Sequence, residues 1–472
     1  MVFSSTIFTF GFLPIVLVLY YIAKEEYRNY ILLAASLLFY AYGEPKFVYV
    51  MVASIIINYA AARMLDIVKV EKGRRALLIA DIAVNIGILF LFKYLDFSIS
   101  IVNRLFHVNM PFYGIVLPIG ISFFTFQALS YVVDVYRREV PAQKNIFYVA
   151  LYIALFPQLV AGPIVRYNTV EAQIRKRSVS MEKFGEGAKR FMLGFAKKIL
   201  LANQLAVVAE QVFACTDYKE ESVLLLWIGA ICFSLQIFYD FSGYSDMAIG
   251  LGKMFGFTFE ENFRYPYISG SATEFWRRWH ISLGSWFRDY VYIPLGGSRV
   301  SGARHLFNLF VVWLLTGIWH GANTTFIVWG LLYFVMLVME KFLIRPWDRK
   351  CPVRVFWRLI TLLCIIFEWI IFNSPSVLSG MQYIASMLGL IGTDRAGTME
   401  VVRICREYGI YMLAGIVFAM PVSEKLSTML QRTGGLATAR TYLLPVLYLL
   451  VFLWATSFLI LGAHNPFIYF NF

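Results

Sequence analysis

His320 is the side chain in this sequence best suited to proton-transfer chemistry. The 472-residue chain has five histidines, and this one follows the apolar run LFNLFVVWLLTGIW and precedes GANTTFIVWGLLYFVMLVME. It falls at a break between two segments of membrane depth, where an ionisable side chain is costly to keep and is a functional candidate. A neutral imidazole accepts a proton near pH 7, and the flanking Gly317 and Gly321 allow backbone or substrate to approach closely. General-base catalysis and a hydrogen-bonded structural histidine both remain open.

A second histidine, His280, lies in the segment TEFWRRWHISLGSWFRDYVYIPLGG. This segment is too charged to face lipid and too aromatic to be a free loop. It therefore predicts a helix that lines a wet cavity or the cytoplasmic interface. The alternative is structural ion pairing, in which Asp289 binds Arg288 or a neighbour.

A third stretch, LQIFYDFSGYSDMAIGLGKMFGF, places polar side chains in apolar surroundings. Gln236 and Asp240 are one helical turn apart and share a face. We expect the buried carboxylates to pair with arginines of the following segment, which is a structural role. Asp81 and Glu368 are further carboxylates at membrane depth, and the sequence assigns them no role.

Around these histidines we select a set of candidate substrate-binding residues. Arginines near the Gly296-Gly297 turn suit the phosphates of coenzyme A or an acidic carrier protein, because a guanidinium binds phosphate through two parallel hydrogen bonds. The whole candidate set is Trp276, Arg277, Arg278, Arg299, Asp240 and Asn323.

Several familiar catalytic motifs are absent from the sequence. It contains no P-loop, no dinucleotide-binding glycine motif, no G-x-S-x-G and no cluster with metal-ligand spacing. Its five cysteines form no disulfide or zinc pattern. We therefore expect chemistry that rests on acid–base and positioning effects, with no metal and no bound cofactor.

The elements that must position these residues are membrane helices. The chain is 60% hydrophobic and only 15% charged, whereas soluble domains average roughly 45–50% apolar and about 25% charged. Spanning helices need about 20 mostly apolar residues. Candidates lie near 5–23, 46–64, 76–93, 115–133, 222–252, 323–341, 355–372, 408–421 and 441–462, with shorter apolar pieces near 30–42, 146–161, 306–319 and 376–391.

These segments predict an all-α, multi-pass membrane protein with about ten to twelve embedded helices. No soluble domain, long linker or internal repeat is visible, so we expect one membrane domain over residues 1–472. Charged residues follow the first apolar run and none precedes it, which favours a retained first helix with its start outside rather than a cleaved signal peptide.

The net charge of +13 is explained by cytoplasmic loops rather than by nucleic-acid binding. Basic residues cluster at 63–75, 166–198, 264–304 and 341–358. The positive-inside rule places all four groups in the cytoplasm, and setting topology is a sufficient role for them. Within the second group, residues 181–199 form an amphipathic pattern that Ser180 can cap. Such a helix lies on the inner membrane surface or packs against the protein's own cytoplasmic face.

The same segments resemble the membrane-bound O-acyltransferase family, and specifically its alginate O-acetyltransferase branch. The matching pieces are LPIGISFFTFQALSYVVDVYR, FPQLVAGPIVRY, DFSGYSDMAIGLGKMFGF, ENFRYPYISGSATEFWRRWHISLGSWFRDYVYIPLGG and LTGIWHGANTTFIVWG, together with the opening MVFSSTIFTFGFLPI and the ending NPFIYFNF. By this resemblance His320 matches the family's principal catalytic histidine and His280 its second, less invariably essential one.

The resemblance implies a ring of helices around a thinned centre, with funnels from both faces that meet near the histidine. It also implies a cytoplasmic thioester donor, either acetyl-CoA or an acyl carrier protein. The acyl group would leave on the other side, where a membrane-anchored partner resembling SGNH hydrolases completes the transfer. His320 then serves as the base that deprotonates the incoming hydroxyl. His280 and nearby indole N–H groups would orient the donor or its developing oxyanion.

The expected function is therefore acetyl transfer to a cell-surface polysaccharide by an enzyme of the bacterial inner (plasma) membrane. Within this class, the alternative is D-alanyl transfer toward teichoic acid from a carrier-protein thioester. From another class, the alternative is a non-enzymatic transporter or scaffold whose intramembrane polar residues form a pathway. The lack of repeats and the histidine-centred resemblance count against the transporter.

Overall fold

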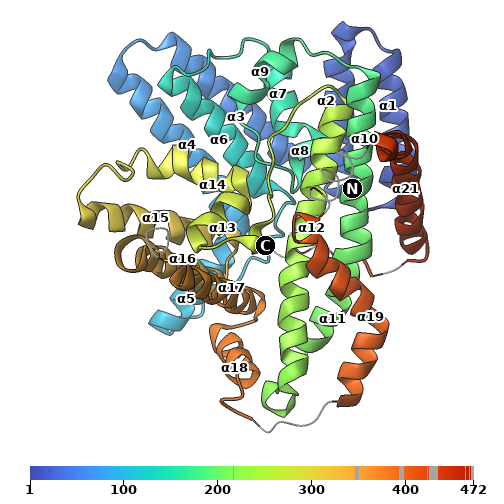
Figure 1. Ribbon diagram of the computed structural model, residues 1–472. Coiled ribbons are helices and arrows are strands. Elements are labelled where there is room, and N and C mark those ends of the chain that lie inside the picture. Colours follow the sequence, from blue (N-terminus) through green and yellow to red (C-terminus); the bar gives the residue numbers. More distant parts are fainter. Residues whose placement is uncertain are drawn as a thin grey trace. The chain divides into compact units, whose positions relative to one another are not determined.

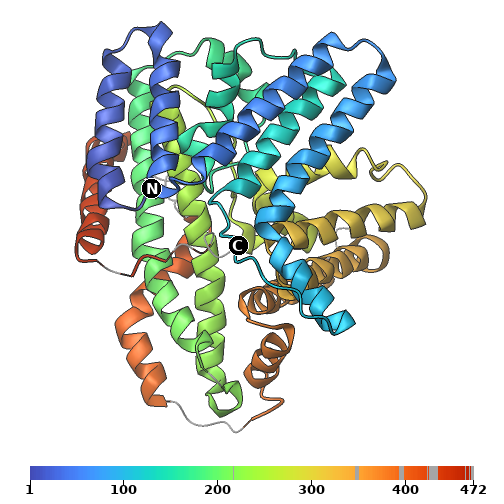
Figure 2. The same cartoon turned by 180° about the vertical axis from the view of Figure 1, so that it is seen from behind.

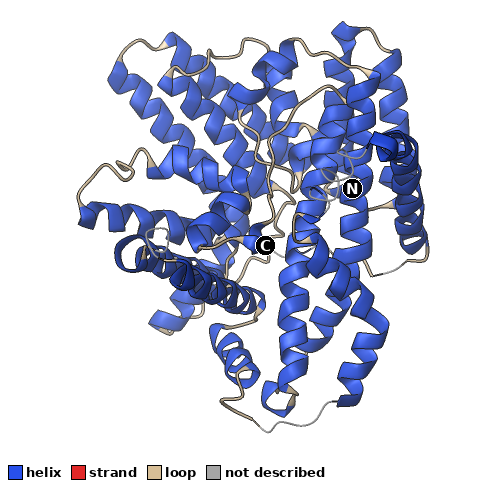
Figure 3. Ribbon diagram, viewed as in Figure 1, coloured by secondary structure: helices blue, strands red, loops and turns tan. Residues whose placement is uncertain are grey.

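Helices account for the regular secondary structure of the described residues (Figure 3). The computed structural model describes residues 1–215, 217–345, 350–392, 398–422, 424, 434–462, 464–466 and 468. The predicted all-α class is confirmed over these ranges. Arg349 of the fourth basic group, and most of the NPFIYFNF ending, lie outside the described residues.

The chain divides into two compact units. Unit 1 comprises Met1–Phe191 and Ser245–Glu260, and unit 2 comprises Met192–Tyr244 and Glu261–Phe472. The elements from the N-terminus to residue 196 are η1 (Ile7–Phe12), α1 (Leu13–Ile22), η2 (Glu25–Tyr27), α2 (Arg28–Gly43), α3 (Val48–Ile67), α4 (Glu71–Lys93), α5 (Leu95–Phe106), α6 (Ile121–Arg137), α7 (Ile146–Ala154), α8 (Phe156–Leu159), α9 (Tyr167–Arg175) and α10 (Met181–Ala196).

The second part of the chain carries the candidate site. Its elements are η3 (Lys197–Ala202), α11 (Asn203–Phe213), η4 (Tyr218–Glu220), α12 (Val223–Met254), η5 (Pro266–Ile268), α13 (Ala272–Arg278), α14 (Ile281–Phe287), η6 (Arg288–Tyr292), α15 (Gly302–His320), α16 (Thr324–Val338), η7 (Met339–Ile344), α17 (Cys351–Asn373), α18 (Val377–Met387), α19 (Thr398–Phe418) and α21 (Gly434–Ile460). Helices α15, α16 and α17 pack in succession (Figure 1).

In unit 1, α3, α4 and α6 run side by side, as the view from behind shows (Figure 2). Helix α6 begins at Ile121 and not near residue 115, because Gly120 before it adopts a left-handed conformation with φ of 76°. Between α3 and α4, Asn58 and Asn85 are buried and hydrogen-bond each other at 3.1 Å through both amides. This pair satisfies polar groups that lipid could not satisfy.

Seven helices within the described residues are long and apolar enough to cross a membrane. They are Val48–Ile67, Glu71–Lys93, Met181–Phe213, Val223–Met254, Thr324–Ile344, Cys351–Asn373 and Leu443–Ile460. The multi-pass prediction is therefore confirmed. The expected total of ten to twelve embedded helices, which counts shorter and tilted pieces, stays a prediction.

The segment from residue 181 differs from the sequence-based expectation. Ser180 accepts the backbone N–H of Lys183 at 3.1 Å, as predicted. However, the helix does not end near residue 199. It continues through a π-helical turn into one element, Met181–Phe213, whose most apolar window is 72% buried. That window excludes the charged residues at the start of the helix, so both placements expected for residues 181–199, on the inner membrane surface or against the protein's own cytoplasmic face, stay predictions. The amphipathic pattern covers only its first half.

Topology yields a prediction that labelling can check. In a variant whose five native cysteines are replaced, we introduce single cysteines at the exposed positions Lys72, Lys176, Arg299 and Lys350. All four should resist a membrane-impermeant thiol reagent in intact cells, because the positive-inside rule places them in the cytoplasm. Met110 follows α5, the short helix that comes after the α4 span, so we expect a cysteine there to lie outside and to react. Labelling of any of the first four from outside would overturn the assigned orientation.

Candidate active site

His320 is the last residue of α15 and is 6% exposed. Its helix packs closely on α16, because a Cβ atom added to Gly317 would lie 2.6 Å from the carbonyl oxygen of Phe326. Similarly, a Cβ on Gly330 would lie 2.5 Å from the Trp313 carbonyl oxygen. Both positions therefore require glycine. The predicted close approach of backbone is confirmed at Gly317, whereas the neighbour of Gly321 is the Phe326 ring.

Aromatic rings surround the His320 imidazole. Ring centroids of Trp329, Trp319 and Phe372 lie 4.9, 5.0 and 5.5 Å from it, and all three rings meet it edge-on. These rings continue into a larger aromatic cluster of unit 2, which includes Trp276, Trp279, Trp313, Tyr333 and Trp369. Such an environment excludes water and strengthens electrostatic interactions within it.

Two indole groups in this cluster are buried hydrogen-bond donors. Nε1 of Trp329 and Nε1 of Trp276 have no hydrogen-bond partner among the described residues. The two rings are 5.7 Å apart, and Trp329 contacts His320 directly. A buried unsatisfied donor is costly, so its presence beside the imidazole suits an oxygen of a bound ligand.

His280 lies between α13 and α14 and is 1% exposed. Its backbone is left-handed, with φ of 43° and ψ of 53°. This conformation costs a non-glycine residue about 1–3 kcal/mol and persists only where the surroundings enforce it. Nδ1 lies 3.2 Å from Oδ1 of Asn262, and the Phe241 ring meets the imidazole edge-on at 4.5 Å.

Trp319 brings the two histidines into one site. Its ring centroid is 6.1 Å from that of His280 and 5.0 Å from that of His320. The imidazoles are also within electrostatic range of each other. Two histidines that are 40 positions apart in sequence therefore share one aromatic wall, as a two-histidine site requires.

A buried carboxylate holds α13, the short helix that leads to His280. Glu340 is 0% exposed and lies in the π-helical turn η7. Its Oε1 accepts the backbone N–H of Ala272 at 2.5 Å and Nε1–H of Trp357 at 3.1 Å. Its Oε2 accepts both the backbone N–H of Thr273 at 2.9 Å and its hydroxyl at 2.7 Å. A carboxylate at a helix N-terminus satisfies N–H groups that have no partner within the helix.

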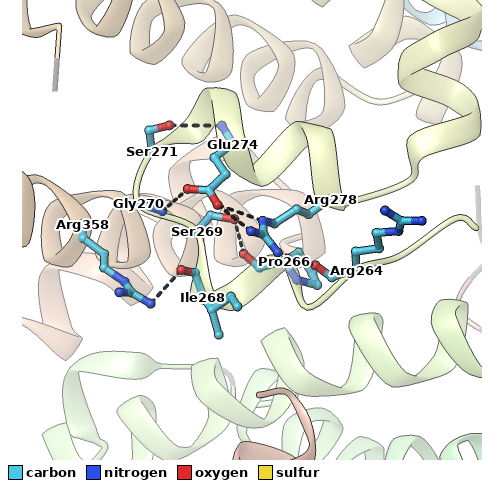
Figure 4. A network of polar contacts seen from close by, with 9 residues as sticks. All are labelled: Arg264, Pro266, Ile268, Ser269, Gly270, Ser271, Glu274, Arg278 and Arg358. Carbon is cyan, nitrogen blue, oxygen red and sulfur yellow. Dashed lines mark hydrogen bonds and ion pairs between the residues drawn. The ribbon is translucent and has the colours of Figure 1, made fainter. Parts of the chain in front are cut away.

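A capping box completes the start of α13 (Figure 4). Ser271 Oγ accepts the backbone N–H of Glu274 at 3.1 Å, and the Glu274 carboxylate accepts the N–H of Gly270 at 2.8 Å. That carboxylate also forms an ion pair with Arg278 at 2.8 Å. Arg278 in turn donates to the carbonyl of Arg264, whose own N–H donates back to the Arg278 carbonyl at 2.9 Å. Both ends of this seven-residue helix are thus fixed.

The predicted phosphate-binding residues are only partly brought together. Arg277 and Arg299 are exposed, whereas Arg278 is occupied by its ion pair with Glu274. The Gly296-Gly297 turn exists, with φ of 109° and 59°. Lys341 lies within electrostatic range of Arg277, which adds a cation that the sequence interpretation missed.

His305 is a titratable side chain within electrostatic range of Lys341. Burial lowers its pKa below the ordinary value, and the nearby Lys341 charge lowers that pKa further. Nε2 of its ring lies 2.9 Å from the hydroxyl of Tyr292. The predicted local pairing of Asp289 is also confirmed, because Arg288 binds it at 2.6 Å.

Two other candidates hold the structure together. Asn323 caps α16 by accepting the backbone N–H of Thr325 at 3.2 Å, directly after the site histidine. Asp240 forms an ion pair at 2.6 Å with Lys198, and both side chains are 2% exposed. It also accepts the backbone N–H of Ile468 at 2.9 Å. The partner of Asp240 comes from the preceding helix, so the expected pairing with an arginine of the following segment was wrong for this residue.

Two residues of the site were missed from the sequence, Glu340 and Asn262. Glu340 is the first charged residue after the long apolar run that follows His320, and a charge at this position normally marks the end of a membrane helix. Asn262 has no local signal, since its contacts to His280 and Ser282 are 18 and 20 positions away. A carboxylate at the end of an apolar run is the sequence signal that could have identified Glu340.

Comparison with known proteins agrees with this geometry. Residues 121–383 match the model of the membrane-bound O-acyltransferase family, a range that contains both histidines, Asn262 and Glu340. The chain is 37% identical to a probable alginate O-acetylase of Pseudomonas putida, over 100% of both chains. It is 32% identical to a peptidoglycan O-acetyltransferase of Helicobacter pylori, over 84% of this chain and 81% of the other. A teichoic acid D-alanyltransferase of Bacillus subtilis is 27% identical over 55% of this chain and 67% of the other.

The family match covers more than half of the chain, and the similarity to two of these relatives extends well beyond it. Its residues form the buried two-histidine site and the helices that position it. This chain belongs to the membrane-bound O-acyltransferase family.

Proposed function

We propose that this protein transfers an acetyl group from a cytoplasmic thioester across the membrane for O-acetylation of a cell-surface polysaccharide. The observation that carries the proposal is the setting of His320, an imidazole at 6% exposure enclosed by Trp319, Trp329 and Phe372. The proposal is supported by relatives named as alginate O-acetylases and a peptidoglycan O-acetyltransferase.

In the proposed reaction His320 acts as the general base. The imidazole takes the proton of the acceptor hydroxyl as its oxygen attacks the thioester carbonyl. The carbonyl oxygen gains negative charge, and its stabilisation by the N–H groups of Trp329 and Trp276 is supported by their burial without a partner among the described residues. The carbon–sulfur bond then breaks, and the departing thiolate receives the proton from the imidazolium. The products are an acetyl ester and a free thiol, so the histidine ends unchanged.

Basic side chains of unit 2, namely the exposed Arg277 and Arg299 and the half-buried Lys341, support a site for the donor. Arg277, Arg299 and Lys341 are cations that suit the phosphates of coenzyme A or of a carrier protein's phosphopantetheine arm. We further propose a membrane-anchored partner of the SGNH-hydrolase kind, which passes the acetyl group to the polymer outside. The cell membrane of a bacterium is the location that such a reaction needs.

D-alanyl transfer toward teichoic acid is the second candidate. It is supported by similarity to a D-alanyltransferase, but at lower identity and over less of the chain than the O-acetylases. The transporter or scaffold alternative has no comparable support, because the family match covers the site residues themselves.

The test is thiol release from defined thioesters in proteoliposomes. With a hydroxyl acceptor present, we expect turnover with an acetyl thioester, presented on coenzyme A or on a carrier protein, and little with a D-alanyl carrier thioester. Acetylation of added polymer should stay low until the membrane-anchored partner is included. Faster turnover of the D-alanyl thioester would contradict acetyl as the transferred group. Full polymer acetylation by this chain alone would contradict the need for a partner.

A further inference from the structure

Asn262 binds the imidazole of His280 through one oxygen atom that three donors share. Oδ1 lies 3.1 Å from the backbone nitrogen of Ser282, 2.9 Å from the Ser282 hydroxyl and 3.2 Å from His280 Nδ1. The residue is 1% exposed, so water does not compete for these contacts. The backbone of Asn262 adds a further link, since its carbonyl accepts the N–H of Ile281 at 3.0 Å.

The orientation of the Asn262 amide follows from the chemistry of its partners. The backbone N–H of Ser282 can only donate, so the amide atom that faces it must be the oxygen and not the nitrogen. The Ser282 hydroxyl has one hydrogen. It lies closer to Oδ1, at 2.9 Å, than to His280 Nδ1, at 3.4 Å. The hydroxyl hydrogen therefore goes to the amide oxygen.

An amide oxygen only accepts hydrogen bonds, and this fixes the proton on His280. Nδ1 at 3.2 Å from that oxygen must carry a hydrogen, because two lone pairs facing each other would repel. In the neutral imidazole, Nε2 is then the nitrogen without a proton. Nε2 of a ring held in this tautomer presents a lone pair, so this nitrogen can accept a hydrogen bond or a proton but cannot donate one.

We propose that Asn262 is a positioning residue that locks His280 in the Nδ1–H tautomer, so that Nε2 acts as an acceptor in the transfer reaction. The part that concerns the reaction rests on the function proposed above. It narrows the role expected from the sequence, in which His280 orients the donor or its developing oxyanion. A neutral imidazole with a bare Nε2 does not stabilise an oxyanion, whereas it does orient a hydroxyl or thiol by accepting its hydrogen.

The left-handed backbone conformation of His280 also supports this positioning role. The residue is held in a left-handed conformation by α13 on one side and by the Asn262 contacts on the other. Such strain is retained where a side chain must point in one direction. The Asn262 interactions act on both the ring and the following turn, so one residue sets both the direction of the imidazole and its proton.

The direct test is nitrogen NMR of the protein with ¹⁵N-labelled histidine rings in lipid nanodiscs. The chain has five histidines, and a His280→Gln variant identifies the His280 signals. We expect a protonated Nδ1 and an unprotonated Nε2 in the wild type at pH 7.5. Asn262→Ala should abolish this pattern or mix it with the other tautomer. An Nε2–H tautomer in the wild type would overturn the proposal whether or not the protein transfers acetyl groups.

Activity measurements separate positioning from simple folding. Asn262→Ala should lower kcat about 10- to 100-fold, a range typical of partners that orient a histidine ring. Asn262→Asp keeps the accepting oxygen and should recover most of the rate. Its added carboxylate also stabilises the imidazolium, so the acid limb of the pH–rate profile should move to higher pH. An aspartate variant as inactive as the alanine variant, or one with an unshifted profile, would contradict the role.

A matched control is available in unit 1. Asn58 is equally buried and hydrogen-bonded through its side chain, but its partners are Ser54 and Asn85. Asn58→Ala should lose stability while leaving the His280 tautomer and the kcat of folded protein within about twofold of wild type. If the control moved the tautomer as much as Asn262→Ala does, the effect would be general and the assignment would fail.

Discussion

Replacing His320 with glutamine is expected to lower acetyl transfer about 100- to 10,000-fold, the range that a lost general base produces. Glutamine keeps the approximate size of the side chain and can still hydrogen-bond, but it cannot take up a proton. The edge-on contacts with Trp329 and Phe372 are weak individually, so the folded state should survive. The measurement is thiol release from the acetyl thioester in proteoliposomes, normalised to monodisperse protein by size-exclusion chromatography.

The control for this variant is a substitution of Phe372, a buried residue that contacts His320. Phe372→Leu removes one ring contact to His320 without touching the imidazole, so it should reduce the rate far less. If His320 only supported the structure, His320→Gln and Phe372→Leu would both keep most of the activity. Near-normal activity of well-folded His320→Gln would therefore end the general-base assignment.

The second large effect is expected at Glu340, because four hydrogen-bond donors converge on its carboxylate. In Glu340→Gln the new NH₂ group faces two of those donors. Each donor left unsatisfied in a buried site costs about 1–3 kcal/mol. We expect a lower thermal unfolding temperature in detergent. We also expect a loss of activity per folded molecule, since α13 leads directly to His280.

Glu274 provides the matched control on the same helix. Its side chain is 40% exposed and its ion pair with Arg278 is partly solvated, so Glu274→Gln should change stability by less than about 1 kcal/mol. Both variants remove one negative charge from the start of α13. Equal unfolding temperatures and rates for the two would show that the carboxylate of Glu340 does not anchor the site.

Local composition was enough to predict most of the helices. Apolar runs located α3, α12, α16 and α17 to within a few residues, because a membrane segment must satisfy its backbone internally and cover it with apolar side chains. The same reasoning did not show that the amphipathic stretch at residues 181–199 continues into one longer helix, Met181–Phe213. Periodicity records which face is polar, and a polar face can be covered by other parts of the protein as well as by water.

The two histidines of the candidate site could be singled out from the sequence, but not the residues that support them. His320 stands out because a histidine at membrane depth is rare and costly, and His280 because its segment is both charged and aromatic. Their supports are pairs distant in sequence, such as Asn262 with His280 and Glu340 with Thr273. Asp240 illustrates the limit, since a buried carboxylate needs a cation but the sequence does not say which one. Lys198 fills that role from a π-helical turn, and helical periodicity does not predict such a turn.

The helix that starts at Thr324 and ends in the π-helical turn η7 carries two contacts of the site at a fixed spacing. Trp329 near its beginning contacts His320, and Glu340 near its end holds α13. Removing one residue between them would shift Glu340 by about 1.5 Å along the axis and about 100° around it, which turns its carboxylate away from Ala272 and Thr273. Substitutions along this stretch leave that spacing intact, whereas a single insertion or deletion does not. The number of residues between Trp329 and Glu340 therefore sets the distance between the histidine contact and the anchor of α13.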